Sequence, residues 1–89
     1  MKTKTFHIKK DGGGHMRPCG SLVRLLQKFE EVEFKAYMLD TPKNIVNPKS
    51  IMDLLTLKMF QGSSVVFEID NEEKDYVFDD IQKIFDEFF

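Results

Sequence analysis

Alternating apolar and polar residues along three short segments predict β-strands. The segments are residues 3–9, 31–38 and 64–69. In the first of them, Phe6 and Ile8 fall on one side and polar residues on the other. Because successive side chains of a strand point to opposite faces, each segment is expected to be half-buried. Residues 39–44 have the composition of a turn, and residues 45–46 are expected to form a short return strand after it.

Three further segments carry apolar residues at the three- and four-residue spacing of an amphipathic helix. The first helix is expected to start close to residues 15–17, because the proline that follows is tolerated only in a first turn. The second opens at Ser50, with Asp53 placed as in a capping box, and runs to about Leu57. The third follows Asn71, a residue suited to capping. The apolar positions are Leu22, Val23, Leu25, Leu26 and Phe29 in the first, Ile51, Met52, Leu54, Leu55, Leu57, Met59 and Phe60 in and after the second, and Val77, Ile81, Ile84, Phe85 and Phe88 in the third.

The resulting element order is β-α-β-β-α-β-α, which predicts an α+β fold. We expect a two-layer open-faced sandwich, in which a four-stranded, mostly antiparallel sheet is covered on one face by three helices and is open to water on the other. The 89 residues, 1–89, are expected to form one domain, since the sequence shows no internal repeat or linker. A domain of this size has room for a single core, so its function is expected on the surface, where a partner completes the site.

Composition narrows the class of function. Hydrophobic residues make up 42% of the chain and charged residues 31%, which is typical of a soluble globular domain. The net charge of −2 argues against direct binding of nucleic acid or of an anionic membrane surface, because both need a basic surface. Cys19 is the only cysteine, so no intrachain disulfide forms, and no stretch resembles a signal peptide or a membrane span. We therefore expect a cytoplasmic protein that does not insert into membranes.

The segment most informative about chemistry is residues 14–18, Gly-His-Met-Arg-Pro. His15 stands at the start of a predicted helix, where backbone N–H groups without a partner favour an anion. Arg17 adds a guanidinium suited to phosphate oxygens, and a neutral imidazole is a nucleophile near pH 7. Together these groups meet the needs of a phosphoryl group carried on His15. On local sequence alone, a capping or surface histidine is the favoured interpretation, because short motifs often match by chance.

Residues 15–18, His-Met-Arg-Pro, resemble the active-site stretch of the HPr family, the phosphocarriers of the bacterial phosphoenolpyruvate-dependent sugar phosphotransferase system. Residues 47–52, Asn-Pro-Lys-Ser-Ile-Met, resemble the family's second signature, around its regulatory serine. The two stretches occur in the family's order, and the likeness covers nearly the whole chain. The resemblance implies that His15 accepts a phosphoryl group from Enzyme I and donates it to Enzyme IIA domains of sugar permeases, while Arg17 steadies the phosphoryl oxygens. It implies a relay protein without metal or cofactor rather than a self-contained enzyme, and we expect a monomer.

The resemblance also implies a regulatory site and a surface for partners. Ser50 matches the serine that a dedicated kinase phosphorylates in HPr proteins of low-GC Gram-positive bacteria, and a catabolite-control regulator would then be a further partner. From the residues alone, an N-cap is the simpler role for Ser50. The second helix has more apolar residues than one face of two turns buries, so either part of it is exposed for protein contact or all of it packs around an irregular loop. The implied partner-binding residues are Met16, Gly20, Arg24, Ile51, Met52 and Leu55.

Three residues near the histidine depart from the family's usual pattern: Gly14, Met16 and Cys19. They keep open a second class of function, an HPr-like regulatory module that binds proteins in carbon catabolite control and has little or no role in sugar uptake. Cys19 also has the spacing from His15 of a Cys–His dyad or of half a metal site. Because His7 is the only other histidine and is expected on the surface, packing as a small apolar residue is the simpler interpretation of Cys19.

Overall fold

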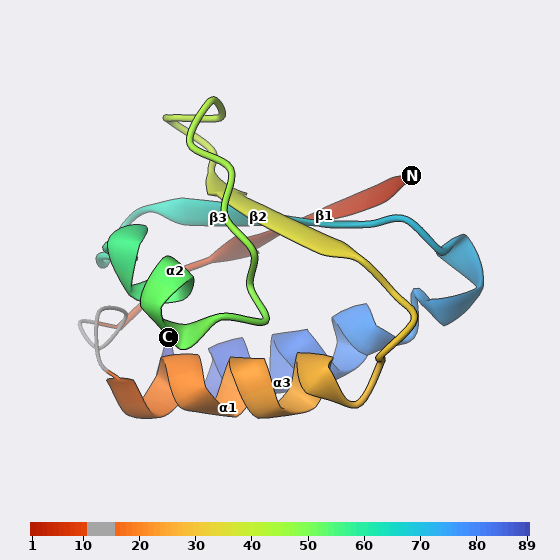
Figure 1. Ribbon diagram of the computed structural model, residues 1–89. Helices are drawn as coiled ribbons and strands as arrows, with labels where there is room; N and C mark the ends of the chain where they lie inside the picture. The colour runs from red at the N-terminus through yellow and green to blue at the C-terminus, as the bar shows by residue number, and fades with distance from the viewer. Residues whose placement is uncertain (11–15) are drawn as a thin grey trace.

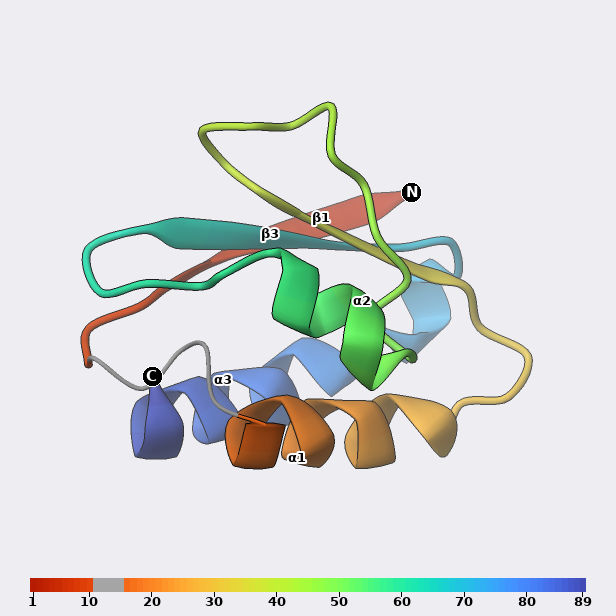
Figure 2. The ribbon, with the colours of Figure 1, turned by 60° about the vertical axis from the view of Figure 1, so that its left-hand side comes forward.

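Within residues 1–10 and 16–89, which the computed structural model describes, three strands and three α-helices form two layers (Figure 1). The elements are β1 (Lys2–His7), α1 (Met16–Gln27), β2 (Phe34–Met38), α2 (Ile51–Thr56), β3 (Ser64–Ile69), a 3-10 helix η1 (Glu72–Lys74) and α3 (Val77–Phe88). The sheet is antiparallel with strand order β1-β3-β2. Figures 1 and 2 show α1 and α3 side by side beneath it, with α2 between the sheet and α1. The predicted α+β sandwich with helices on one face is confirmed.

The prediction of a fourth strand is wrong in the described part of the chain, where residues 45–46 contribute only an isolated bridge. Ala36 and Val46 exchange two backbone hydrogen bonds, of 3.1 and 2.9 Å. A longer ladder would use the backbone groups two residues away on either side of Val46. The Asn44 N–H already donates to the Thr41 carbonyl at 3.1 Å, and Pro48 has no N–H. The pairing therefore stops at one bridge, and the segment before it projects beyond the sheet as a loop (Figures 1 and 2).

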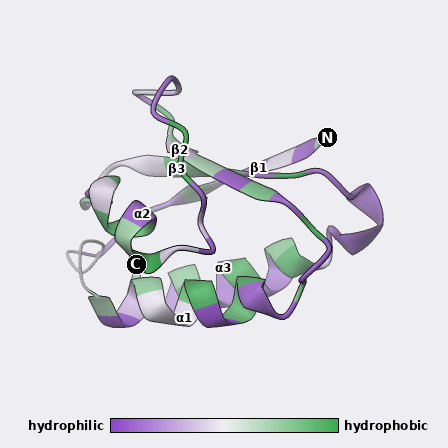
Figure 3. Ribbon diagram, viewed as in Figure 1, coloured by the Kyte–Doolittle hydropathy of each residue, from purple (hydrophilic) through white to green (hydrophobic). Residues whose placement is uncertain are grey.

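The predicted helix starts agree with the structure except at the last helix. Asn71 caps η1 instead of α3, because its side chain accepts a hydrogen bond of 3.0 Å from the Glu73 N–H. The single turn of η1 then leads into α3 at Val77. Both α1 and α3 carry hydrophobic residues interspersed with hydrophilic ones along their length, as expected of amphipathic helices (Figure 3). None of the helices in the described ranges is long and apolar enough to cross a membrane.

The register of the sheet separates a core face from an open face. Phe67 of β3 lies opposite Ala36 of β2 and is fully buried in the core, whereas the next pair along, the buried Val66 and the half-buried Tyr37, lies on the other face. Of the polar residues of β1, Thr3, Thr5 and His7 share the face of Val66, whereas Lys2 and Lys4 pair with Ile69 and Phe67 at the exposed edge of the core face. The core residues of the three strands are Phe6, Phe34, Ala36, Met38, Val65, Phe67 and Ile69.

An aromatic cluster joins the core face of the sheet to α3. Phe6 of β1 stacks on Phe85 of α3 with ring centroids 5.0 Å apart, and Phe85 stacks on Phe89 at 4.5 Å. Phe67 of β3 meets Phe6 and Phe85 edge-on, at 5.6 and 6.1 Å. All four side chains are almost completely buried. Stacked and edge-on pairs stabilise a core beyond the area they bury, so this cluster fixes α3 against the sheet.

Truncating Phe85 should therefore be among the most damaging single changes to the fold. We expect Phe85→Ala to lower the free energy of unfolding by about 3–5 kcal/mol, because it leaves a cavity among three other rings. Urea denaturation of the purified variants measures the loss. Phe60→Ala is the matched control, since that ring is 61% exposed and its removal should cost less than about 0.5 kcal/mol. Equal losses in the two variants would contradict the assignment of the core.

Candidate functional site

His15 and Gly14 lie outside the described residues, so the site is built from the residues that follow them. α1 begins at Met16, directly after His15, as the sequence predicted. Met16 and Arg17 are exposed, and the first turn of α1 carries no acidic residue. The amides of these two residues occupy the first helical positions, where an α-helix provides no internal acceptor. This end of α1 therefore offers N–H donors, the positive end of the helix dipole and a guanidinium to an anion.

The next two residues anchor the start of α1 in the core. Pro18 is buried, and Cys19 is fully buried. Burial raises the pKa of the Cys19 thiol above its ordinary value, because a thiolate is poorly solvated there. A nucleophile or metal ligand needs the thiolate, so this environment opposes the dyad and metal-site interpretations of Cys19. The interpretation as a small packed residue is confirmed by its burial.

Gly20 of α1 lies next to Ile51 at the start of α2. A Cβ atom placed on Gly20 would lie 3.7 Å from the Ile51 Cδ1 atom and 3.6 Å from an Arg24 guanidinium nitrogen, Nη1. Both are ordinary van der Waals distances, so the space beside Gly20 accommodates a Cβ atom and is closed beyond it by Ile51 and Arg24. Met16 lies one turn before Gly20 on the same side of α1. The structure therefore brings together residues that are more than thirty positions apart in the sequence.

The apolar residues of α2 and the loop after it divide between the core and the surface. Leu54, Leu57 and Met59 are buried, whereas Met52 is 66% exposed. Ile51 and Leu55 are half-buried. The alternative in which all of these residues pack inward is therefore wrong. We use the term docking patch for the residues that the family resemblance implies as partner-binding, namely Met16, Gly20, Ile51, Met52 and Leu55, with Arg24 at its rim.

Ser50 caps α2, as the sequence predicted. Its Oγ atom accepts a hydrogen bond of 3.4 Å from the Asp53 N–H. Asp53 does not complete a capping box, because its carboxylate accepts from the Asn47 N–H at 3.1 Å and the Ser50 N–H donates to the Asn47 carbonyl. Next to the cap, the Lys49 ammonium donates to the Phe29 carbonyl at 2.7 Å. This contact ties the start of α2 to the turn after α1.

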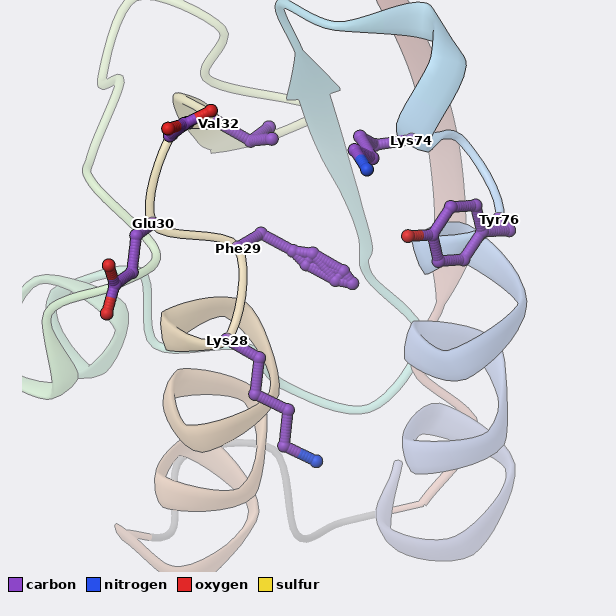
Figure 4. A pocket seen from close by; sticks show the side chains of 7 residues that line it. Lys28, Phe29, Glu30, Val32, Lys74 and Tyr76 are labelled. Carbon is purple, nitrogen blue, oxygen red and sulfur yellow. The ribbon is translucent and has the colours of Figure 1, made fainter.

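Other candidate groups lie apart from this region. His7 is exposed, as predicted, and its Nδ1 atom is 2.8 Å from the Ser64 Oγ atom. In the ranges that the structure describes, no group of three or more histidine, cysteine, aspartate or glutamate residues is arranged to hold a metal. An open hollow of about 490 Å³, which the sequence did not indicate, lies where α1 ends and α3 begins. The side chains of Phe29 and Tyr76 point into it, with ring centroids 5.8 Å apart (Figure 4).

Comparison with known proteins decides the family. The model of the family described as the PTS HPr component phosphorylation site matches residues 2–87. This chain belongs to the HPr family. The phosphocarrier protein HPr of Lysinibacillus sphaericus is 30% identical over 79 residues, which are 89% of this chain and 85% of that protein. The resemblance drawn from the two sequence signatures is thereby confirmed, and the chain is a member of a family of phosphocarriers of the phosphotransferase system.

Solved HPr structures share the fold. HPr-C-His from Thermoanaerobacter tengcongensis superposes with a TM-score of 0.80 at 26% identity, covering 97% of this chain and 92% of that one. HPr from Bacillus anthracis gives a TM-score of 0.76 at 18% identity, covering 93% and 94%. The two-layer architecture is therefore that of HPr, although one strand of the expected sheet is reduced here to a bridge.

The burial of Cys19 leads to a test that separates a packed thiol from a reactive dyad. We expect the native protein to react with iodoacetamide at least roughly tenfold more slowly than the protein unfolded in urea, because its thiol is inaccessible and protonated. Mass spectrometry of timed samples measures both rates on the single cysteine. A dyad would lower the thiol pKa and speed alkylation, so faster labelling of the native protein would contradict the packed assignment.

Proposed function

We infer that this chain is a phosphocarrier that accepts a phosphoryl group on His15 from Enzyme I and passes it to Enzyme IIA domains of sugar permeases. The observation that carries this proposal is the start of α1, where exposed Met16 and Arg17 directly follow His15 and stand on a buried Pro18–Cys19 anchor. Membership in the HPr family supports it. The proposal includes a monomer that works in the cytoplasm.

The proposed transfer exchanges one bond to phosphorus for another. A lone pair of the His15 imidazole forms a bond to phosphorus while the donor's bond to the same phosphorus breaks, so the phosphoryl group moves without water or a cofactor. Its oxygens would be stabilised by the Arg17 guanidinium and by the amides of Met16 and Arg17, which have no acceptor within α1. In the second transfer, an acceptor group of an Enzyme IIA domain forms a bond to phosphorus while the bond between His15 and phosphorus breaks. Because the chain supplies only the acceptor and its electrostatic support, partners complete the site.

The docking patch is the proposed surface for these partners. It joins the start of α1 to the start of α2, and its exposed atoms are mainly those of Met16 and Met52. Methionine side chains adapt their shape, which suits a surface that must fit Enzyme I and several Enzyme IIA domains in turn. Arg24 at the rim would favour acidic partner residues and orient the encounter.

Ser50 is the proposed regulatory phosphorylation site for an HPr kinase. A phosphate there would sit at the N-terminus of α2, where the free amides favour it, and would add negative charge beside Ile51 and Met52. That charge would lower the affinity for Enzyme I and favour a catabolite-control regulator instead. The Asp53 carboxylate nearby would oppose the added charge, so we expect weak recognition of Ser50 by the kinase.

The competing proposal is an HPr-like regulatory module whose output is protein binding alone. The departures at Gly14, Met16 and Cys19 favour considering it. The two proposals differ in what happens when His15 is replaced. A phosphocarrier loses all function in His15→Ala, whereas a binding module keeps its affinity for its partners.

Phosphorylation of the purified protein tests the carrier directly. The protein is mixed with phosphoenolpyruvate and a broad-acting Enzyme I, and its intact mass is followed over time. We expect the mass of one phosphoryl group to be added, and the product to be labile in acid, as phosphohistidine is. His15→Ala should remain unmodified, whereas His7→Ala, the matched control at the only other histidine, should be phosphorylated normally. No phosphorylation even by Enzyme I of the same organism would contradict the carrier and leave the binding module.

Arg17 gives a second, quantitative test of the same site. Arg17→Ala should accept the phosphoryl group about ten- to a hundredfold more slowly, because a charge-assisted hydrogen bond to the phosphoryl oxygens is lost. The rate is measured with the same mass assay at limiting Enzyme I. Lys28→Ala, which removes a cation at the far end of α1, is the control and should change the rate little. Equal rates for Arg17→Ala and the parent protein would remove Arg17 from the site.

A further inference from the structure

We propose that Met16 and Met52 are sites of reversible oxidation, at which a peroxide converts the two thioethers to sulfoxides and thereby weakens partner docking. The inference rests on the proposed function, because the docking patch has a role only if the chain binds Enzyme I. It adds a modification that couples phosphoryl transfer to oxidants in the cell.

The five methionines of the chain fall into two groups by exposure. Met16 is 62% exposed, Met52 66% and Met1 74%, whereas Met38 is 6% and Met59 only 1% exposed. Oxidation of a thioether requires contact between its sulfur atom and the oxidant. A peroxide therefore reaches three of the methionines, and the other two are protected by the core.

Two of the three exposed methionines belong to the docking patch. Met16 is the first residue of α1, directly after His15, and Met52 is the second residue of α2. Gly20, one turn after Met16, lies against Ile51, the residue before Met52, so the two exposed methionines flank this contact between the helices. Met1 lies before β1, at the end of the sheet remote from the start of α1, with its amino group 3.6 Å from the Glu72 carboxylate (Figures 1 and 2).

The chemistry needs only the oxidant. The sulfur lone pair attacks one peroxide oxygen, an S–O bond forms, the O–O bond breaks, and water leaves when the peroxide is hydrogen peroxide. Sulfur loses two electrons and the peroxide gains them. The product is polar where the thioether was apolar, and methionine sulfoxide reductases reverse the change. Burying an unpaired polar oxygen against an apolar partner surface is unfavourable, so we expect roughly tenfold weaker binding of Enzyme I.

The experiment treats the full chain with hydrogen peroxide and maps each methionine by peptide mass spectrometry. We expect added oxygen on Met1, Met16 and Met52 and little on Met38 and Met59. Calorimetric titration with Enzyme I should then show an affinity roughly tenfold lower than before treatment, restored by sulfoxide reductases. The double variant Met16→Leu/Met52→Leu keeps Met1 as an internal control. For each protein, the affinity for Enzyme I after peroxide treatment is divided by the affinity of the same protein before treatment. This ratio should stay near one for the double variant.

The outcomes separate this inference from the proposed function. If the untreated chain does not bind Enzyme I, the proposed function fails and the inference falls with it. If it binds and oxidation of Met16 and Met52 leaves the affinity unchanged, the inference alone is wrong. The inference is also wrong if Met1 is oxidised while Met16 and Met52 are not. It fails as well if the loss of affinity accompanies a fall in melting temperature, which would show that oxidation acts by unfolding the chain.

Discussion

The packing of aromatic rings between the sheet and α3 is the constraint on which the rest of the structure depends. Phe6, Phe67 and Phe85 are contributed by β1, β3 and α3, so the cluster closes only when the two ends of the chain are brought together. α1 then packs beside α3 and under the sheet, and its first turn is held by Pro18 and Cys19. The direction in which the start of α1 points is therefore set by the packing of α1 against α3 and by the burial of Pro18 and Cys19. In a chain of this size the core supplies the rigidity, and the chemistry is left at the surface.

Two surface properties adjoin each other where α1 and α2 begin. The first turn of α1 favours an anion, because its first amides have no acceptor within the helix and it carries Arg17 and no acidic side chain. The docking patch beside it is mainly apolar, and Gly20 lies against Ile51 within it. A phosphoryl carrier needs both properties, one to hold the charged group and one to bind several proteins briefly. Under the proposals above, phosphorylation of Ser50 beside the patch, or oxidation of Met16 or Met52 within it, would add a charge or a polar atom where partners are expected to bind.

Local periodicity was sufficient for much of the fold. β3 has the predicted bounds, residues 64–69, because its alternation is uninterrupted, and Ser50 caps α2 because capping depends on a few neighbouring residues. The prediction of a fourth strand was wrong because the Asn44 N–H donates within the preceding turn and Pro48 has no N–H, so neither residue can extend the pairing. Long-range features had no local signal, among them the stacking of Phe89 and the approach of Gly20 to Ile51. The candidate chemistry of His15 and Arg17 could be inferred from the residues themselves. The surplus of apolar residues in the second helix indicated an exposed apolar surface as one of two alternatives, whereas the individual residues of the docking patch came from the family resemblance.

A carrier must give up its phosphoryl group as well as accept it, and delivery to a permease domain tests the central claim most directly. The chain is phosphorylated with labelled phosphoenolpyruvate, separated from Enzyme I, and mixed with an Enzyme IIA domain from the same organism. The account predicts that the label leaves His15 and appears on the Enzyme IIA domain faster than it is lost to water. Label that stays on this chain, or that is only hydrolysed, would contradict a carrier and indicate a protein that is phosphorylated for another purpose.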